Sequence, residues 1–262
     1  MDVSLKDWGV VIPAGGLVPD PLATRLGTPR KALAQILGRT SIEWTLDAVR
    51  GAGFTPIAVV SGEDVHEVIG DDHWVPESTG QIENAQAGIV ALGHPSKILF
   101  LPADSPFLDP AGLRDFVAEV EMRRDLEESK WYAAGLCLRA RYEEVFPGWS
   151  NPSIRLRDAD LMSGAYFATS LEGFQHGADL FRSISESRKS QFKMLLRFGL
   201  VPLVRYFFHR VSLAEAETRL SKAFSGQALI VPSADARSIA DIDTVEDYER
   251  LVAVAEKFLT RR

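Results

Sequence analysis

The chain has 262 residues and a formal net charge of -7 at pH 7, with 46% hydrophobic and 25% charged residues. This balance is typical of a globular protein that buries its own core; the negative charge argues against nucleic-acid binding, and the single cysteine, Cys137, excludes an intrachain disulfide. The sequence has neither a secretory leader nor an apolar run long enough to cross a membrane, so we expect a cytoplasmic protein with no membrane partner.

The first half of the chain alternates short apolar runs with amphipathic segments. Three apolar, mostly β-branched runs predict buried strands, at 10–12, 56–61 and 98–101. Apolar residues three or four positions apart predict two helices, one beginning at Ser41 and one over 80–92. Strands and helices that alternate at this spacing predict βαβ units and a mostly parallel sheet.

The second half has weaker patterns. Its predicted elements are, in chain order, a strand at 131–139, two strands around a polar turn within 153–169 and mostly helices over 171–225. Ile239 and Ile242 predict a short strand, and Thr244 followed by Asp247 is typical of a helix start. Because no flexible linker interrupts these elements, the whole chain, 1–262, is predicted to form one α/β domain.

The segment after the first predicted strand is small, flexible and basic. Ala14, Gly15 and Gly16 lack bulk, so their backbone N–H groups could approach an anion closely. Positive charge follows at three positions, Arg25, Arg30 and Lys31. Together they would suit a triphosphate, and an ordinary glycine turn with solvated basic residues is the alternative. The glycine spacing of a dinucleotide fingerprint and the Gly-Lys-Ser/Thr end of a P-loop are both absent.

Acidic residues stand where two later segments leave the predicted core. Asp104 follows the strand at 98–101, at the edge where parallel sheets bind ligands. A carboxylate there could hold Mg²⁺ beside phosphates, and a helix cap or turn residue is an equally good interpretation. Asp241 and Asp243 precede the last predicted helix and could supply a second metal ligand, or could serve only to cap that helix.

Taken in order, these segments resemble the MobA-like nucleotidyltransferase family. The resemblance runs from Val10 to about Leu251 and rests on IPAGG, Arg25, TPRKAL, IENAQAG with Asn84, LPADSPF and DIDTVEDYERL. It implies a Rossmann-like three-layer α/β/α fold with a mostly parallel mixed sheet, of the glycosyltransferase-A or nucleotide-diphospho-sugar transferase type. It also implies a nucleotide-binding half at about 8–130 and an acceptor-side, more helical half at about 131–262.

The same resemblance implies an activity and the residues that carry it. A nucleoside monophosphate would pass from an NTP to a phosphorylated small molecule with release of pyrophosphate, and Mg²⁺ or Mn²⁺ would be the cofactor. The implied nucleotide-binding residues are Ala14, Gly15, Gly16, Lys31 and Asn84. Lys31 and Arg25 are implied as catalytic residues, and Asp104 and Asp243 as metal ligands.

Two further features concern the acceptor and an insertion. The family's acceptor-facing turn corresponds in part to Gly164, and Lys189 and Lys193 are spaced to share a helix face that could bind the acceptor phosphate or remain solvated. Relative to the molybdenum-cofactor enzymes, Pro19–Leu26 is inserted, and we interpret it as a lid or specificity segment over the nucleotide. Two other kinds of protein would have the same residues. One is a glycosyltransferase that uses a nucleotide sugar, and the other is a non-catalytic nucleotide-binding protein. The base of the NTP, the acceptor and the oligomeric state cannot be read from the sequence.

Overall fold

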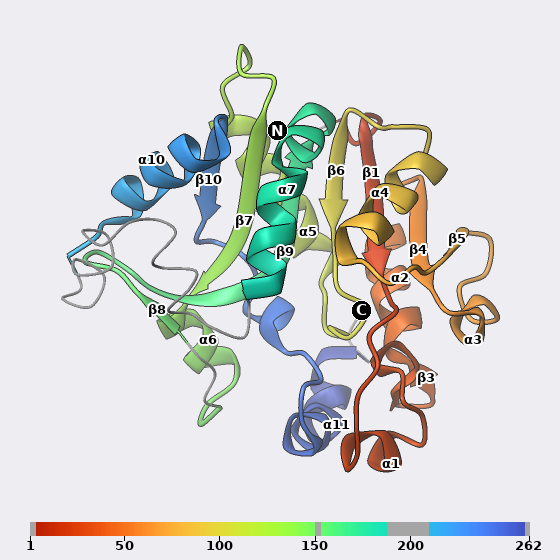
Figure 1. The fold of residues 1–262 in the computed structure, drawn as a ribbon. Helices are drawn as coiled ribbons and strands as arrows, with labels where there is room; N and C mark the ends of the chain where they lie inside the picture. Colours follow the sequence, from red (N-terminus) through yellow and green to blue (C-terminus); the bar gives the residue numbers. More distant parts are fainter. Residues whose placement is uncertain (1–3, 150–152, 188–209, 260–262) are drawn as a thin grey trace.

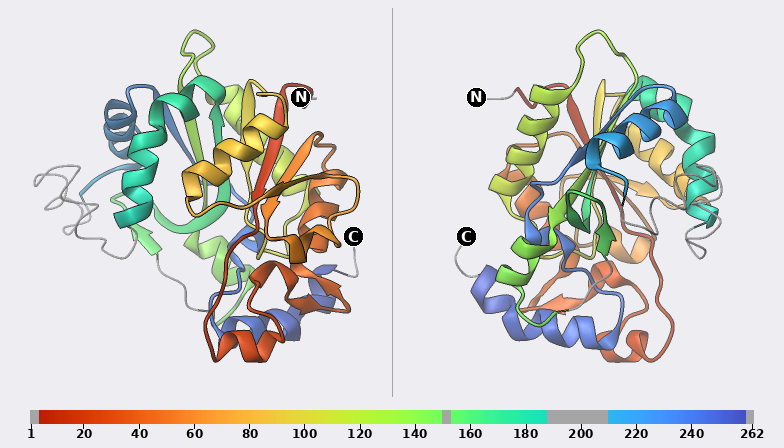
Figure 2. Two further views of the ribbon diagram at one scale, coloured as in Figure 1. Left: turned by 45° about the vertical axis from the view of Figure 1, so that its right-hand side comes forward. Right: turned by 90° about the vertical axis from the view of Figure 1, so that its left-hand side faces the viewer.

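The computed structural model describes residues 4–149, 153–187 and 210–259 (Figure 1). They form one eight-stranded mixed sheet with helices on both faces, which confirms the predicted α/β/α layers (Figure 2). The strands of this sheet are β1 (Trp8–Pro13), β4 (Ile57–Ser61), β5 (His73–Pro76), β6 (Lys97–Phe100), β7 (Trp131–Leu138), β8 (Ser153–Arg155), β9 (Asp160–Ser170) and β10 (Gln227–Val231). A separate two-stranded sheet consists of β2 (Gln35–Ile36) and β3 (Arg39–Thr40).

The helices divide between the two faces of the sheet and one end of it. One face is covered by α2 (Ser41–Gly51) and α5 (Pro110–Arg123), and the other by α4 (Gln81–Ala91), α7 (Leu171–Ser187) and α10 (Leu213–Phe224) (Figure 1). The shorter helices and the last one are α1 (Leu22–Leu26), η1 (Lys31–Leu33), α3 (Glu63–His66), α6 (Arg139–Val145), η2 (Ala236–Ile239) and α11 (Val245–Leu259). Within the described ranges, no helix combines the length and the apolar character that a membrane crossing requires.

The strand order brings four parallel strands together around β1. The sheet runs β10-β7-β9-β6-β1-β4-β5, with β8 paired to β9, and β1 is parallel to both β4 and β6. Val10 and Ile12 are buried in the core beneath α2 and α5, whereas Val11 is buried on the opposite face against α4, as expected for a strand covered on both sides. The carboxyl ends of β6, β1, β4 and β5 therefore lie side by side at one edge.

Local sequence patterns predict the central parallel strands of the first half correctly. All three strands predicted there are present, as β1, β4 and β6, and the helix at Ser41 is α2. The Thr40 side chain accepts a hydrogen bond from the Glu43 N–H while the Glu43 carboxylate accepts one from the Thr40 N–H, so a capping box starts α2. In the second half, β7, the β8–β9 pair and the start of α11 after Thr244 are also confirmed.

Two expectations from the sequence are wrong. The segment from Ile239 to Ile242 is not a strand. Ile239 ends the helical turn η2, which starts where the Asp235 side chain accepts the N–H of Arg237, and residues 240–242 have no regular secondary structure. The insertion at Pro19–Leu26 does not lie over the site as a lid. It forms α1, whose buried Leu22 and Leu26 belong to the same hydrophobic cluster as α11. Apolar side chains at one helix-turn spacing hold this segment on α11, outside the cavity described below.

Candidate active site

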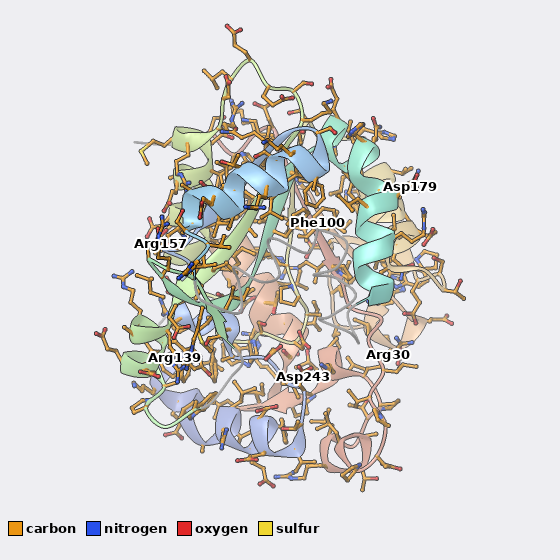
Figure 3. All side chains as sticks on the ribbon, turned by 60° about the vertical axis from the view of Figure 1, so that its left-hand side comes forward. Arg30, Phe100, Arg139, Arg157, Asp179 and Asp243 are labelled. Carbon is orange, nitrogen blue, oxygen red and sulfur yellow. The ribbon has the colours of Figure 1, made fainter. Side chains whose placement is uncertain are left out.

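A cavity of about 1250 Å³ opens at the edge where the parallel strands end. Its walls come from the ends of β1 and β6, the start of η1, the residues after β5, the start of α4, β9, the end of η2 and the chain around the start of α11. Phe100, Arg30 and Asp243 belong to three separate elements around this region (Figure 3). Ligands bind open parallel sheets at this edge, so the cavity is the candidate site.

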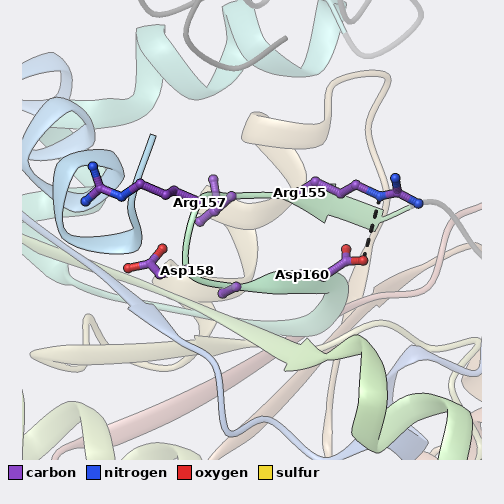
Figure 4. A pocket seen from close by; sticks show the side chains of 6 residues that line it. Arg155, Arg157, Asp158 and Asp160 are labelled. Carbon is purple, nitrogen blue, oxygen red and sulfur yellow. Dashed lines mark ion pairs between the residues drawn. The ribbon is translucent and has the colours of Figure 1, made fainter. Parts of the chain in front are cut away.

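A second, smaller pocket lies on the β8–β9 hairpin (Figure 4). Six consecutive residues from Arg155 to Asp160 line it, and its volume is about 460 Å³. Arg155 and Asp160 form an ion pair there, with 3.7 Å between Nε and Oδ2. A single turn of chain builds this pocket, whereas the large cavity gathers side chains that are distant in sequence.

One end of the large cavity places an ammonium group between two carboxylates. Lys31 Nζ lies 3.2 Å from Asp104 Oδ2 and donates a short hydrogen bond to Asp243 Oδ1. Lys31 is in η1, Asp104 follows β6 and Asp243 precedes α11, and all three line the cavity. The structure thus brings together three residues that the sequence singled out. We call Lys31, Asp104, Asp241 and Asp243 the carboxylate end.

The carboxylate end carries more negative charge than Lys31 can balance. Burial raises the pKa of Asp104, and the nearby Lys31 offsets this only in part. Burial also raises the pKa of Asp241, to about 7, with further contributions from the charges of Asp243 and Asp104. Burial acts to lower the pKa of Lys31, yet its pairs with Asp104 and Asp243 leave that pKa raised. Additional positive charge would therefore be stabilised here.

The donor set at this end fits a hard divalent cation shared with a substrate. Among the described residues, no three His, Cys, Asp or Glu side chains form a group that would hold a metal ion alone. Asp104 and Asp243 nevertheless both contact one cation, the Lys31 ammonium. Mg²⁺ is commonly held by one or two carboxylates together with substrate phosphates, and two carboxylates in one cavity match that pattern.

The other end of the cavity is built around the chain that leaves β1. Gly15 and Gly16 line it, together with Glu77, Ser78 and Thr79, which follow β5. We call this region the glycine-loop end. A Cβ on Gly15 would lie 1.8 Å from Glu77 Oε2, so a larger residue would require that carboxylate to move. Backbone N–H groups without side-chain cover are suited to phosphate oxygens.

The remaining predicted nucleotide-binding residues differ in position. Asn84 lines the cavity, where its Oδ1 accepts hydrogen bonds from the N–H and hydroxyl of Ser78, at 2.6 and 2.8 Å. Asn84 therefore holds the turn after β5. Ala14 is buried, its N–H donates to the Val60 carbonyl at 2.8 Å, and it is not among the cavity-lining residues. The Ala14 N–H is thus used by the sheet and is unavailable to a ligand.

Arg25 is not among the residues that line the cavity. The Arg25 guanidinium pairs with Glu249 at 3.1 Å and lies over the ring of Tyr248, so it stabilises the contact of α1 with α11. Gly164 lies within β9. Lys189 and Lys193 lie outside the described residues. No acceptor phosphate site can be placed on these positions from the described chain.

Several cavity residues carry no clear signal in the sequence. Glu77 and Ser78 follow β5, a strand of only four residues with the sequence HWVP, which has no extended apolar run. Had that strand been recognised, the common edge of parallel strands would have pointed to both residues. Phe100 and Phe167 form an apolar wall, with ring centroids 6.0 Å apart, and a strand pattern alone does not tell a cavity wall from a core.

Comparison with known proteins agrees with this architecture. Residues 10–138 match the model of a family described as the MobA-like NTP transferase domain. A hypothetical transferase structure from Thermus thermophilus superposes with a TM-score of 0.79 and 23% identity, over 92% of this chain and 98% of that one. None of the curated protein sequences matches this chain.

Two further solved structures share the fold at lower similarity. A CMP:2-keto-3-deoxy-manno-octonic acid synthetase complexed with CTP gives a TM-score of 0.60 and 14% identity, over 96% of this chain and 99% of that one. A cytidylyltransferase from Leptospira borgpetersenii gives 0.55 and 16%, over 97% and 88%. At these identities the likeness establishes the fold, which is of the nucleotide-diphospho-sugar transferase type.

Proposed function

We propose that this chain, whose residues 10–138 belong to the MobA-like NTP transferase domain family, transfers a nucleoside monophosphate from an NTP to a phosphorylated small molecule. One observation carries the proposal. A single cavity joins a glycine loop without side-chain bulk to a lysine held between two carboxylates. The first suits the oxygens of a triphosphate, and the second suits the charge that moves when a phosphate bond breaks.

The reaction would ask little covalent chemistry of the protein. An oxygen of the acceptor phosphate would form a bond to the α-phosphorus, while the bond from that phosphorus to the α–β bridging oxygen breaks. Pyrophosphate would leave with the electron pair. Catalysis of this kind rests on positioning and charge stabilisation. Lys31 would stabilise the charge on the phosphates, and the N–H groups of Gly15 and Gly16 would bind their oxygens.

Asp104 and Asp243 would hold the divalent cation, Mg²⁺ or Mn²⁺, with Asp241 close beside them. When bound, the ion would neutralise negative charge on the phosphate groups. Lys31 would keep a contact with the same carboxylates and so stay close to the phosphates. Asn84 would hold the turn after β5 in the position from which Ser78 faces the cavity.

A thermal-shift screen tests the proposal at its first step. The four common NTPs are each added with Mg²⁺, and pyrophosphate release is then measured against pooled phosphorylated metabolites. Stabilisation by at least one NTP, with pyrophosphate release that requires Asp104, is the expected result. Stabilisation only by nucleotide sugars would favour a glycosyltransferase. Binding of an NTP without release of pyrophosphate for any acceptor would favour a nucleotide-binding protein without catalysis.

A further inference from the structure

The guanidinium of Arg30 joins three strand ends beside the cavity. Its Nη1 donates to the Gly15 carbonyl at 3.0 Å, its Nε to Asp64 Oδ2 at 2.7 Å and its Nη2 to Glu77 Oε1 at 2.6 Å. Gly15 follows β1, Asp64 is in α3 directly after β4, and Glu77 follows β5. The Arg30 side chain is only 11% exposed, whereas those of Asp64 and Glu77 are 45% and 27% exposed, so the guanidinium is covered and its carboxylate partners reach solvent.

The guanidinium of Arg30 fits here because a neighbouring residue, Gly62, has no side chain. A Cβ on Gly62 would lie 2.1 Å from Arg30 Nη2. The main chain of Arg30 pairs with Leu17 in an isolated antiparallel bridge, and the Val18 N–H donates to the Pro29 carbonyl at 2.8 Å. Arg30 is therefore held to the glycine loop through its main chain and through its side chain.

The contact with the Gly15 carbonyl determines the direction of the next N–H group. In a planar trans peptide the carbonyl and the following N–H point to opposite sides. Since the Gly15 carbonyl points to Arg30, the Gly16 N–H points away from Arg30, and Gly16 itself lines the cavity. Throughout the described chain, no residue accepts a hydrogen bond from the Gly15 or Gly16 N–H. Both donors remain for a ligand.

Arg30 itself is not suited to bind the phosphates. Each of its three guanidinium nitrogens already donates a hydrogen bond within the protein. Arg30 is not among the cavity-lining residues, whereas the next residue, Lys31, is. Arg30 has extended backbone angles, φ -98° and ψ 118°, and successive side chains of extended chain point to opposite sides. One basic residue therefore faces the strand ends and the next faces the carboxylate end.

We propose that Arg30 is the positioning residue of the triphosphate site: it holds the Gly15–Gly16 peptide so that the Gly16 N–H faces the bound phosphates, and Asp64 and Glu77 hold its guanidinium in place. This inference rests on the proposed function, because it takes the bound anion to be the triphosphate of an NTP. Lysine cannot replace Arg30 here, since a single ammonium group cannot donate to the same three acceptors as the planar guanidinium.

The test compares Arg30→Lys with a matched arginine away from the cavity. Arg50 also donates to a main-chain carbonyl, that of Ile69 at 2.9 Å, and to a carboxylate, Asp72, so Arg50→Lys is the control. Both variants are measured for melting temperature, for KM and kcat with the NTP, and for thermal stabilisation by inorganic tripolyphosphate. That probe has no base or ribose, so it reports on the phosphate contacts alone.

Arg30→Lys should raise the KM for the NTP by about tenfold, as expected for the loss of one charge-assisted contact, and change kcat by less than about threefold. Its stabilisation by tripolyphosphate should fall in parallel. Arg50→Lys should lower the melting temperature without changing KM. Equal KM values for the two variants would overturn the inference.

A second variant keeps the inference testable if Arg30→Lys does not fold. Glu77→Gln removes the charge of one guanidinium partner and leaves Arg30 and Asp64 in place, so it should raise the KM for the NTP by a smaller factor in the same direction. An unchanged KM in Glu77→Gln would contradict the role of Arg30. A wild-type protein that neither binds nor turns over any NTP would instead overturn the proposed function, and this inference with it.

Discussion

The two ends of the cavity each place one basic residue between two carboxylates, yet the two cations serve different purposes. At the glycine-loop end, Arg30 is bonded to Asp64, Glu77 and a carbonyl, and it lies outside the cavity wall. At the carboxylate end, Lys31 pairs with Asp104 and Asp243 and lines the cavity. Two adjacent positions with the same charge thus differ in place: the Arg30 contacts lie behind the cavity wall, and the Lys31 contacts lie in the cavity.

The chemistry of the two side chains explains the difference. A guanidinium is a planar fork that satisfies several fixed acceptors at once, whereas an ammonium is a compact charge whose donors can turn toward a new partner. The glycine-loop end is therefore suited to stay as it is when a ligand binds. The carboxylate end is suited to change, because its excess of carboxylates favours an added cation.

The largest effect is expected at Asp104. Asp104→Asn removes a carboxylate that would hold the cation, so pyrophosphate release should fall by about 100-fold or more, as for other lost electrostatic contacts in active sites. The fold should persist, because Lys31 keeps Asp243 as a partner. Steady-state kinetics and a melting curve check both. The control is Asp64→Asn, which changes a partner of Arg30 and should lower kcat by less than about tenfold. A loss of kcat as large as that of Asp104→Asn would contradict the difference between the two ends of the cavity.

Lys31→Met should separate catalysis from cation binding. Turnover should drop by about 10- to 100-fold, because the charge beside the phosphates is lost. The affinity for Mn²⁺ without nucleotide should rise by roughly tenfold, because the competing ammonium is gone. Mn²⁺ titration by calorimetry measures this. Lys97→Met is the control, since Lys97 pairs with Glu121 at 2.8 Å and does not line the cavity. Weaker Mn²⁺ binding in Lys31→Met would contradict the prediction.

A smaller effect is expected in the glycine loop. Gly15→Ala would bring a Cβ to 1.8 Å from Glu77 Oε2 and force that carboxylate away from Arg30. We expect the free energy of unfolding to fall by about 1 kcal/mol and NTP affinity to weaken several-fold. Chemical denaturation and thermal shift measure these changes.

Two comparisons isolate the cause of that effect. Gly16→Ala meets no atom within 4 Å, so it should leave the free energy of unfolding nearly unchanged. Adding Glu77→Ala to Gly15→Ala should give less than the sum of the two single losses, because both disturb the same contact. Strictly additive losses would show that Gly15 and Glu77 act separately.

The smallest effect is expected at Arg25, the third basic residue of the loop. Its pair with Glu249 is largely exposed, with 48% and 57% of the two side chains accessible, so Arg25→Ala should cost at most about 1 kcal/mol of stability. Its kcat and KM should stay within about twofold of the wild type. A loss of kcat approaching that of Lys31→Met would mean that Arg25 reaches the cavity during turnover.

The fold was largely predictable where local patterns are strong. Buried parallel strands such as β1, β4 and β6 are continuous apolar runs, and α2 begins at a capping box, so each is visible in a short window of sequence. The strand β5 is short and half-buried, and η2 begins where the Asp235 side chain accepts a backbone hydrogen bond. Neither element therefore has such a pattern in the sequence. Glu77 was missed with the strand that precedes it.

The candidate site was predictable in part for the same reason. Asp104 and Asp243 could be singled out because each stands next to a predicted strand or helix, and Lys31 because of its charge and the family resemblance. The structure brings the three into contact. Arg25 could not be separated from Lys31 by charge or spacing. The insertion that carries Arg25 could be read equally as a lid or as a packed turn, and only the burial of Leu22 and Leu26 beside α11 distinguishes these.

By itself the sequence determined the alternation of strands and helices in the first half of this protein, the edge of the sheet where the cavity lies and the residue types available there. Those follow from the period of apolar residues and from where polar residues interrupt it, which are local properties. Only the tertiary structure decided which of the basic residues faces which carboxylates. Arg30 and Lys31 are adjacent in the chain, and their carboxylate partners lie 34 to 212 positions away. Contacts over such separations depend on how strands and helices pack, and no local pattern encodes them.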